Sequence, residues 1–383
     1  MKIPSLLIFL LFASVCHGQW TPYRFPSQID SLAQVEDGVQ SDPGTEYSWI
    51  GNYRKALEIF GNRKKTEISP EQKALIQKYH PVDAEKYILQ RAKKAKVVII
   101  NEAHHVPMHR VFMESLLKGL RDEGFDMLGM ETFMDQDSAI QRRGYPTVSE
   151  SGYYAAEPCY GNMIRKALSL KYQLFGYETN GSGEREINQA DNIIRMIKEH
   201  PHSKFVIYCG YAHLIKDTII KEDGWRHAMA GWLRLKTGID ALTIDQVTLT
   251  ETGVDSFDDA WRRMIHEDKP VIMIDDKGRS LKAERQYNAD ISVYHPDTKY
   301  IHGRPDWQVT DDKRTESINH KITIGLPCLA FVYRAGEDYE KAVPTDVIEI
   351  KNKEEDIHII LEKKQKNVIV LLNPKGEQQI IFE

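Results

Sequence analysis

The chain has 383 residues, of which 41% are hydrophobic and 28% are charged, with 51 Lys and Arg against 56 Asp and Glu and a net charge of −5. These values are typical of a globular protein with one large or two modest domains, and they exclude a disulfide-stapled mini-protein, a coiled coil or a disordered chain as the overall description. The slightly acidic balance, without a long Lys/Arg run, argues against a nucleic-acid partner, because such proteins displace counterions from phosphate with a basic face.

The N-terminus has the pattern of an export signal. Lys2 is followed by an apolar stretch over 3–15 and by Cys16-His17-Gly18, which predicts a signal peptide over 1–18 that is removed after Gly18. The alternatives are a buried N-terminal helix and a lipid anchor on Cys16, although Val15 is a poor neighbour for a lipidated cysteine. No later stretch of about 18 residues is apolar, so we expect a periplasmic or extracellular protein without a membrane span.

Three cysteines remain once the signal peptide is removed: Cys159, Cys209 and Cys328. An odd, widely spaced set without a Cys-x-x-Cys pair indicates neither a disulfide framework nor a structural zinc site, and it permits no more than a single bridge. Cys209 lies in an apolar run, so we expect a small buried hydrophobe there and no nucleophile.

The region after the signal divides into a leader, a helical segment and an α/β body. Residues 19 to about 48 are rich in Pro, Ser, Gln and Asp without periodicity, which predicts an extended leader lying on a neighbouring part of the molecule. Residues 50–95 are expected to be helical because Ala56, Ile59 and Phe60 share one helical face. From about residue 96, β-branched runs alternate with helical patterns, which predicts an α/β fold with a mainly parallel sheet and helices on both faces.

The predicted strands of this sheet are Lys96–Asn101, Phe125–Glu131, Gln173–Glu178, Phe205–Gly210, Ala241–Gln246 and Val271–Asp275. Apolar side chains at helical spacing predict a helix between the first two strands and another between the third and fourth: Phe112, Leu116, Leu117 and Leu120, then Ile187, Ala190, Ile194 and Ile197. Gly124 is expected to end the first of these helices.

A small antiparallel β module of about 60 residues is predicted at the C-terminus, because strand patterns become dense there. Its expected strands are Ile322–Ile324, Cys328–Tyr333, Asp346–Ile350, His358–Leu361, Asn367–Leu372 and Gln378–Ile381, with a turn at Asn373-Pro374-Lys375-Gly376. We therefore expect an N-terminal region over 19–95, a catalytic α/β domain over 96–315 and the β module over 316–383.

Titratable residues lie at the carboxyl ends of four of the predicted parallel strands. Glu131 and Glu178 end the second and third strands, and the first and fourth are followed by Glu102, His104 and His105 and by His213, respectively. Ligands bind outside the carboxyl ends of open parallel sheets, so these groups are expected to converge. Taken singly, each has a simpler reading, because a lone Glu often caps a helix and a lone His is often a satisfied polar group.

Two kinds of chemistry suit such a cluster. Carboxylates and imidazoles in a crevice shift each other's pKa values, so that a neutral His or an ionised Glu can take a proton from water. The same groups are ligands for Zn, Mn, Fe or Co, and three ligands with an open position would make a catalytic metal site. No Gly-x-Ser-x-Gly elbow or Gly-rich phosphate loop is present, which argues against a serine hydrolase and a nucleotide-binding protein.

The segment Asn101–His105, an amphipathic helix, Gly124-Phe125 and Met130-Glu131 together resemble the opening motif of the erythromycin esterase-like family. Gly210-Tyr211-Ala212-His213 is similar to its second histidine motif, and Arg185–Asn192 to the helix before that histidine's strand. The same positions, with Pro107 and His109, also resemble the ChaN-like haem-binding proteins and the Tiki metallopeptidases of one broader superfamily. The likeness extends over about 96–310 and leaves out the β module.

The resemblance implies roles for individual residues. Glu102 and His105 would activate water, with Glu131 and His213 completing the site, whereas the ChaN-like and Tiki-like patterns put His104 in the place of His105. The same five residues would hold a divalent metal (Mn, Co or Zn) if one is bound. Asn101 departs from the glycine that the family has at this position. The substrate-binding residues expected around the site are His109, Glu178, Arg185, Tyr153 and Tyr154.

Two further segments are candidates for substrate contacts. The connection Arg142–Asn162 is rich in Gly and Tyr and longer than an ordinary loop of this kind, so it is expected to form a lid or wall, with a disordered linker as the alternative. Its tyrosines would stack on a sugar or macrocycle, or one would ligate haem iron. The cluster Tyr300–Trp307 either lines the cleft or packs on the β module.

The leading hypothesis is an exported hydrolase that uses a Glu/His site to activate water against an ester, lactone or amide of a small molecule or peptide. The alternatives are a ChaN-like haem- or iron-binding protein, a Tiki-like metal-dependent peptidase, and a catalytically inactive binding module.

Overall fold

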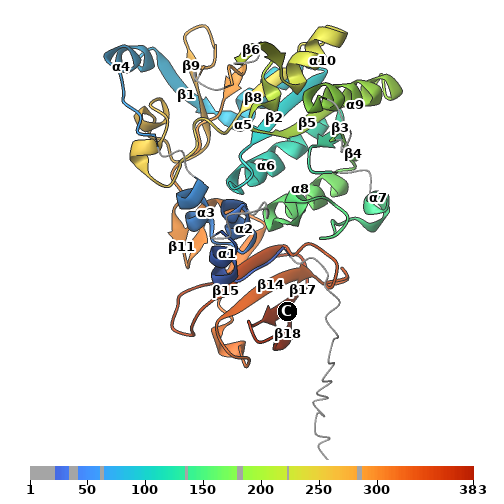
Figure 1. The fold of residues 1–383 in the computed structure, drawn as a ribbon, viewed down its shortest axis with the longest axis vertical. Helices are drawn as coiled ribbons and strands as arrows, with labels where there is room; N and C mark the ends of the chain where they lie inside the picture. The colour runs from blue at the N-terminus through green and yellow to red at the C-terminus, as the bar shows by residue number, and fades with distance from the viewer. Residues whose placement is uncertain are drawn as a thin grey trace, which may run out of the picture.

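The computed structural model describes residues 22–33, 42–60, 64–133, 137–178, 184–221, 224–282 and 287–383. The predicted signal peptide over 1–18 lies outside these residues. Within the described ranges, no helix combines the length and the apolar character needed to cross a membrane. The α/β body and the C-terminal β module lie at opposite ends of the molecule, and the helices within 26–60 lie between them (Figure 1).

The core of the α/β body is a parallel sheet of six strands in the order β10-β8-β2-β5-β3-β4, which confirms the predicted α/β fold. Its strands are β2 (Val97–Glu102), β3 (Phe125–Met130), β4 (Gln173–Gly176), β5 (Lys204–Gly210), β8 (Leu242–Asp245) and β10 (Ile291–Ser292). Five of the six coincide with predicted strands to within two residues at either end, because their apolar runs are bounded by clear turn signals.

Helices cover both faces of this sheet, because successive apolar side chains of β2 point to opposite faces. Val98 and Ile100 pack with α5 (Ala84–Ala92), α6 (Met108–Asp122) and α8 (Pro158–Ser169) on one face. Val97 and Ile99 point to the other face, against α9 (Arg185–Glu199) and α10 (Met229–Thr237). A strand that is apolar on both sides must be covered on both sides, as in other all-parallel sheets.

The sixth predicted strand belongs elsewhere. β9 (Val271–Asp275) pairs antiparallel with β1 (Tyr79–Asp83), a strand that was expected to be part of a helical segment. The parallel edge position is taken by β10, which is too short to give a periodic signal. A second missed feature is the antiparallel hairpin of β6 (Thr218–Lys221) and β7 (Gly224–His227), which projects from the body.

The N-terminal region is helical, so the predicted extended leader is wrong over its described residues. It forms α1 (Pro26–Ala33), α2 (Pro43–Trp49), α3 (Tyr53–Phe60) and α4 (Pro70–Ile76). The α2 and α4 helices each begin with a proline after a capping residue, a signal that composition alone hides: Asp42 accepts from the Thr45 amide, and Ser69 from that of Gln72. The expectation that this region lies on a neighbour agrees with its packing on the β module.

The C-terminal module contains the predicted antiparallel strands in the order β15-β14-β17-β18, together with a β13-β16 pair. The bounds are β13 (Lys313–Glu316), β14 (Cys328–Arg334), β15 (Asp346–Ile350), β16 (Ile359–Glu362), β17 (Asn367–Leu372) and β18 (Gln378–Phe382). Residues 322–324 are not a strand, and β13, which was not predicted, crosses the expected boundary after residue 315. The predicted turn at 373–376 is present, with Gly376 at φ 82°.

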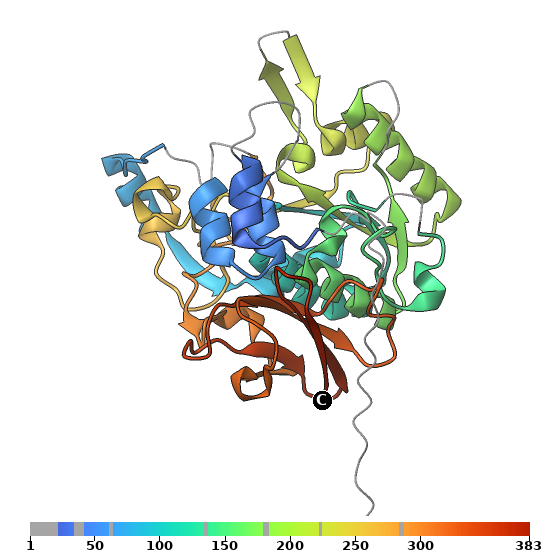
Figure 2. The same ribbon diagram turned by 60° about the horizontal axis from the view of Figure 1, so that its bottom comes forward.

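The module is joined to the rest of the chain by a shared apolar layer and by polar contacts. Figure 2 shows the N-terminal helices behind the module, and side chains of both regions form one cluster that includes Phe25, Ile29, Tyr47, Leu329 and Phe331. The α8 helix adds an ion pair from Arg165 to Glu337 (2.5 Å) and a hydrogen bond from Asn162 Nδ2 to the Thr345 carbonyl (2.8 Å).

The connection predicted as a long loop over 142–162 is shorter than expected. It runs between α7 (Ile140–Arg143) and α8, which begins at Pro158, because Glu157 accepts hydrogen bonds from the amides of Cys159 and Tyr160 and so caps the helix. The described cysteines are free and buried, as expected for Cys209.

Candidate functional site

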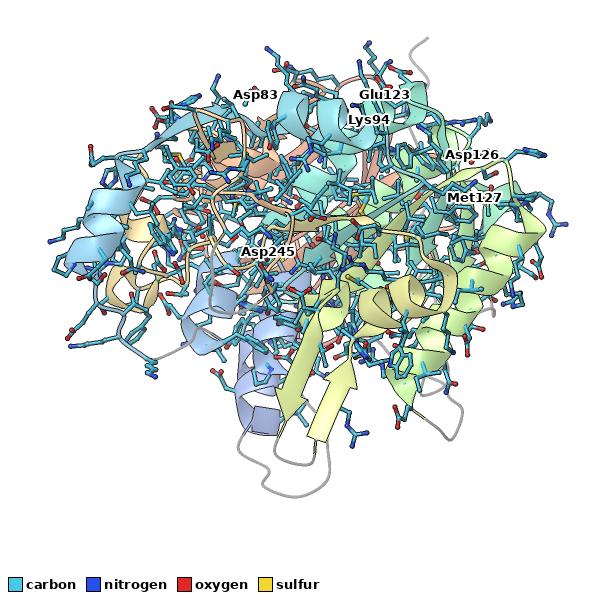
Figure 3. The ribbon with its side chains drawn as sticks, turned by 90° about the horizontal axis from the view of Figure 1, so that it is seen from above. Asp83, Lys94, Glu123, Asp126, Met127 and Asp245 are labelled. Carbon is cyan, nitrogen blue, oxygen red and sulfur yellow. The ribbon has the colours of Figure 1, made fainter. Side chains whose placement is uncertain are left out.

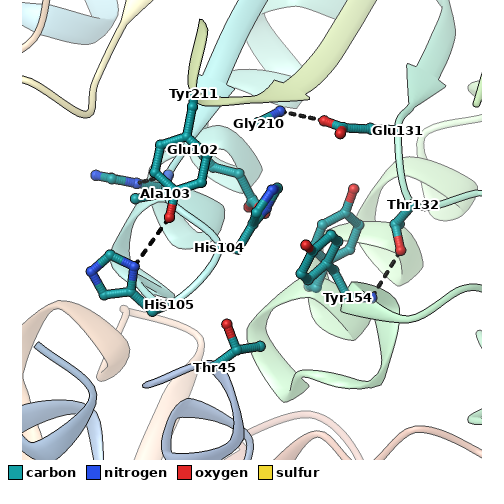
Figure 4. Close-up of polar contacts among 12 residues, drawn as sticks. Thr45, Glu102, Ala103, His104, His105, Glu131, Thr132, Tyr154, Gly210 and Tyr211 are labelled. Atoms are coloured by element: carbon teal, nitrogen blue, oxygen red, sulfur yellow. Dashed lines mark hydrogen bonds and ion pairs between the residues drawn. The ribbon is translucent and has the colours of Figure 1, made fainter. Parts of the chain in front are cut away.

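The site lies at the carboxyl ends of β2, β5 and β3, which are neighbouring strands of the sheet. Seen from above (Figure 3), Lys94 and Glu123, which precede β2 and β3, lie at one rim, whereas Asp245, which ends β8, lies toward the N-terminal helices. The β5 strand stands between β2 and β3 and ends in Gly210. Figure 4 shows Glu102 and His104 on one side of this glycine and Glu131 on the other.

Glu102 is a buried carboxylate, and each of its two oxygens has two hydrogen-bond partners. Arg110 contacts it with two nitrogens, Nε to Oε2 at 2.8 Å and Nη2 to Oε1 at 2.9 Å. The Tyr208 hydroxyl donates to Oε2 at 2.7 Å, and His104 Nδ1 lies 2.9 Å from Oε1. Burial raises the pKa of Glu102, but the Arg110 guanidinium and His104 outweigh it and hold the pKa far below its usual range.

Arg110 in turn is fixed from three sides. Its Nη1 donates to Glu157 Oε2 at 3.0 Å, and its Nη2 donates to the His104 carbonyl at 2.7 Å, in addition to the bidentate pair with Glu102. All three charged groups are essentially inaccessible to solvent. A guanidinium between two carboxylates therefore sets the position of Glu102 and of the backbone that carries His104.

His104 has a defined tautomer and orientation. A carboxylate only accepts hydrogen bonds, so Nδ1 must donate to Glu102, and the lone pair of the neutral ring is on Nε2. The ring stacks on Tyr154 with centroids 3.9 Å apart, and it meets Tyr211 edge-on. A methyl group at Gly210 would lie 2.5 Å from both Cε1 and Nε2 of His104 and 3.2 Å from Glu131 Oε2, so this edge of the ring lies directly over Gly210, at a position that Glu131 borders.

Glu131 forms the second half of the site. Its Oε2 accepts from the Gly210 amide at 2.5 Å, while Oε1 lies 2.5 Å from Arg185 Nη2 and 3.4 Å from His213 Nε2. Burial raises the pKa of Glu131, but the contacts with His213 and the Gly210 amide lower it to about 2. Glu131 is therefore ionised at neutral pH.

His213 lies between two carboxylates. Its Nδ1 is 2.9 Å from Glu186, and its Nε2 faces Glu131. Burial lowers the pKa of His213, but Glu131 and Glu186 together raise it to about 9. The raised pKa favours the protonated imidazole near neutral pH, which has a proton to donate, and Arg185 Nη1 lies 3.2 Å from its Nε2.

His105 does not join this cluster. Its ring stacks on Phe60 of α3 with centroids 4.1 Å apart, and its Nδ1 lies 3.4 Å from the Tyr211 hydroxyl. Burial lowers its pKa to about 3. Of the two adjacent histidines, the structure places His104 against Glu102 and His105 against the N-terminal helices.

The predicted substrate-binding residues divide into three groups. His109 is fully buried, so substrate cannot reach it. The Ala103 amide donates to its Nδ1 at 3.0 Å and its Nε2 contacts Thr250 at 2.8 Å, so His109 supports the turn after β2. Arg185 is half exposed and contacts both Glu178 and Glu131, and Glu178 reaches the site through it.

Tyr154 and Tyr153, which were predicted to bind substrate, lie beside the site. Tyr154 covers one face of His104 and is held by a hydrogen bond from its amide to Thr132 Oγ1 (2.9 Å). Tyr153 is 41% exposed and packs edge-on against Trp49 of α2 with centroids 4.9 Å apart. The wall near His104 is therefore aromatic and partly built by the N-terminal helices.

The residues present do not fit a divalent metal between Glu102, His104, Glu131 and His213. Both oxygens of Glu102 and of Glu131 already accept from N–H or O–H donors, and a cation would face the guanidinium of Arg110 on one side and that of Arg185 on the other. Among the described residues, the group with three metal-ligand atoms within 4.8 Å of one another lies elsewhere. The Asn101 side chain is hydrogen-bonded to Asp245, to the Gln246 amide and to the Tyr211 carbonyl.

Sequence reasoning missed Arg110, Tyr208, Glu157 and Glu186. Arg110 lies on the first turn of α6, eight residues after Glu102, where a charged side chain is usually solvent-exposed. Its burial is set by Glu157, which is far away in the sequence, so no local pattern could have identified it. Tyr208 lies in an apolar strand and Glu186 in an amphipathic helix, so neither pattern indicated a functional residue.

No protein-family model and no curated protein matches the chain. Solved structures show only distant likeness. The type III effector HopBA1 is 13% identical over 57% of this chain and 97% of its own, with a TM-score of 0.34. RRSP, a MARTX toxin effector domain from Vibrio vulnificus, is 16% identical over 57% of this chain and 45% of its own (TM-score 0.31). The C-terminal region of Pasteurella multocida toxin is 10% identical over 72% of this chain and 32% of its own, with a TM-score of 0.29. At these values, none assigns a family or a function to this chain.

Proposed function

We propose that the chain is an exported hydrolase in which His104 takes a proton from a water molecule that attacks an ester, lactone or amide carbonyl. The observation that carries this proposal is the pair formed by His104 Nδ1 and Glu102 Oε1 at 2.9 Å, with the Nε2 edge of the ring over Gly210 and beside Glu131. A general base needs this arrangement of one nitrogen held by a carboxylate and the other free to accept.

The second half of the site supplies the complementary charge. When water loses its proton to His104, the resulting imidazolium is stabilised by ionised Glu102. The tetrahedral intermediate carries a negative oxygen, for which the guanidinium of Arg185 and protonated His213 are the nearest cationic donors. His213 also has a proton to give to the leaving group. Glu131 positions both cations and does not need to change its own protonation state.

This reaction uses residues of the chain alone. The saturated carboxylates and two guanidinium groups argue against the metal-dependent peptidase alternative. For the haem-binding alternative, two of the tyrosines in 142–162 that were candidate iron ligands, Tyr153 and Tyr154, already pack against Trp49 and His104, respectively.

The test is hydrolysis of a panel of esters, lactones and peptides by the mature chain in the presence of a chelator. We expect turnover of at least one class, unaffected by the chelator and reduced roughly 10²–10⁴-fold in His104→Asn. Failure to hydrolyse any member of the panel, or loss of activity with the chelator that metal restores, would contradict the proposal.

A further inference from the structure

A second cluster of metal-ligating side chains lies in the β-rich end of the molecule, away from Glu102 and His104. It comprises His302, at the tip of the hairpin between β11 (Tyr300–Ile301) and β12 (Arg304–Pro305), and Asp356 and His358, which precede β16. Within the described ranges this is the group of His, Cys, Asp and Glu whose ligand atoms all lie within 4.8 Å of one another.

The carboxylate of Asp356 contacts one nitrogen of each of the two imidazoles. Its Oδ2 is 2.8 Å from His302 Nδ1, and its Oδ1 is 3.2 Å from His358 Nε2. The two rings are stacked with centroids 4.1 Å apart and planes inclined by 5°. Three potential ligands therefore converge although 54 residues separate His302 from Asp356.

The backbone holds this convergence in place. His302 has φ 50°, a left-handed conformation that non-glycine residues rarely adopt, and Gly303 follows it at φ 71°. The His358 amide donates to the His302 carbonyl at 3.1 Å, which ties the hairpin tip to the segment before β16. A side chain on Gly303 would meet Ile357 at 3.1 Å, so the two segments approach as closely as a glycine permits.

We propose that His302, Asp356 and His358 bind one divalent transition-metal ion, with Zn²⁺ the best match. Imidazole nitrogens and a carboxylate oxygen are ligands of Zn²⁺ at about 2.0–2.2 Å, which places tetrahedral ligand atoms about 3.4 Å apart. The ligand atoms already lie within 4.8 Å of one another, and metal binding requires one imidazole to turn out of the stack, because each nitrogen lone pair lies in its ring plane and the two planes are nearly parallel. His302 is exposed and has room for this turn. Water fills the fourth position, because His302 and Asp356 are exposed.

The contrast with the first site supports the assignment. Glu102 and Glu131 each pair with a guanidinium group. The hydrogen bond and ion pair of Asp356 are instead with imidazoles, which can exchange a hydrogen bond for a metal bond.

The ion links two parts of the chain, the hairpin tip at His302 and the segment before β16. Two residues after His302, Arg304 is buried and forms an ion pair with Asp346 of β15. Two residues before it, the ring of Tyr300 packs against the guanidinium of Arg54 of α3, whose Cζ lies 4.6 Å from the ring centroid. The hairpin thus connects the N-terminal helices beside the site to the β module. Metal binding at its tip is expected to stabilise this connection.

The experiment is a titration of the metal-free full chain with Zn²⁺ by calorimetry and with Co²⁺ by visible absorption. We expect one saturable site whose occupation raises the melting temperature. Asp356→Asn and His302→Gln should each weaken binding at least about 10-fold, a loss that even outer hydrogen-bond partners of metal ligands can cause. Both positions are exposed, so the variants are expected to fold, which their melting temperatures without metal will show.

The matched control is His320→Gln, which removes another exposed histidine of the β module and should bind like the wild type. Wild-type affinity in Asp356→Asn, or no binding of Zn²⁺ by the wild type at millimolar concentration, would overturn the proposal. So would binding that is lost in Glu131→Gln and kept in Asp356→Asn, because the ion would then be at the other site. None of these outcomes depends on hydrolysis, so the two proposals fail independently.

Discussion

The two adjacent histidines show what a sequence can and cannot specify at the scale of a residue. Four of the residues expected at the strand ends, Glu102, His104, Glu131 and His213, do converge because parallel strands end at one edge of a sheet. The choice between His104 and His105 depends on the turn after β2, which the buried contact of the Ala103 amide with His109 fixes. That contact and the burial of Arg110 are tertiary, so the sequence left both histidines as candidates.

The charge of His213 predicts a pH dependence of stability. Its pKa is raised from 6.5 to about 9, so its contribution is fully present below about pH 6.5 and is lost as the pH rises through about 9. The shift corresponds to about 3 kcal/mol. Denaturant unfolding at pH 6.5 and pH 10 should show a loss of this order in the wild type, and a much smaller loss in His213→Gln. Equal pH dependence in the two proteins would show that His213 is not held as a cation.

At the scale of an element, strand length and pattern decided what could be predicted. Long apolar strands such as β2 and β5 carry a clear signal, whereas β10 has two residues and β1 includes a proline and a histidine. The β9 strand was recognised as a strand but placed in the wrong sheet, because its antiparallel partner β1 was not recognised. The helices α1 and α2 were missed because they are short and polar, although Pro43 after Asp42 is a start signal.

The end of β5 gives a prediction at this scale. Gly210→Ala adds a methyl group 2.5 Å from His104 Nε2, so the ring must move away from its position beside Glu131. We expect a loss of hydrolysis of at least about 10²-fold, as for removal of the base, with a melting temperature close to that of the wild type. Gly325→Ala, at an exposed glycine of the β module whose nearest atoms are the side-chain ends of Asn373 and Glu377, is the matched control and should keep its activity. Full activity of Gly210→Ala would mean that the ring position is not critical.

At the scale of the whole molecule, the sequence correctly predicted an α/β body and a β module but not the way they are joined. The N-terminal helices contribute one side of the apolar cluster on β14 and β15, and α8 contacts the module through Arg165 and Asn162. The contact partners lie more than a hundred residues apart in the sequence, so composition and periodicity could not reveal them. The observed packing argues against a module that is attached by a linker alone.

This packing predicts that body and module unfold together. Leu329 is fully buried in the shared cluster, so Leu329→Ala should lower the free energy of unfolding by about 2–5 kcal/mol. Hydrogen exchange should show the same loss of protection in β2 as in β14. Phe382→Ala, at a side chain that is 77% exposed, serves as the control with little effect. Loss of protection confined to the module would show that the two parts unfold separately.

The most direct test of the central claim compares His104→Asn with His105→Asn on whichever ester, lactone or amide the wild type hydrolyses. If His104 is the base, His104→Asn should lose roughly 10²–10⁴-fold in kcat, while His105→Asn should stay within about 10-fold of the wild type. Comparable activity of His104→Asn and the wild type, or a selective loss in His105→Asn, would contradict the account.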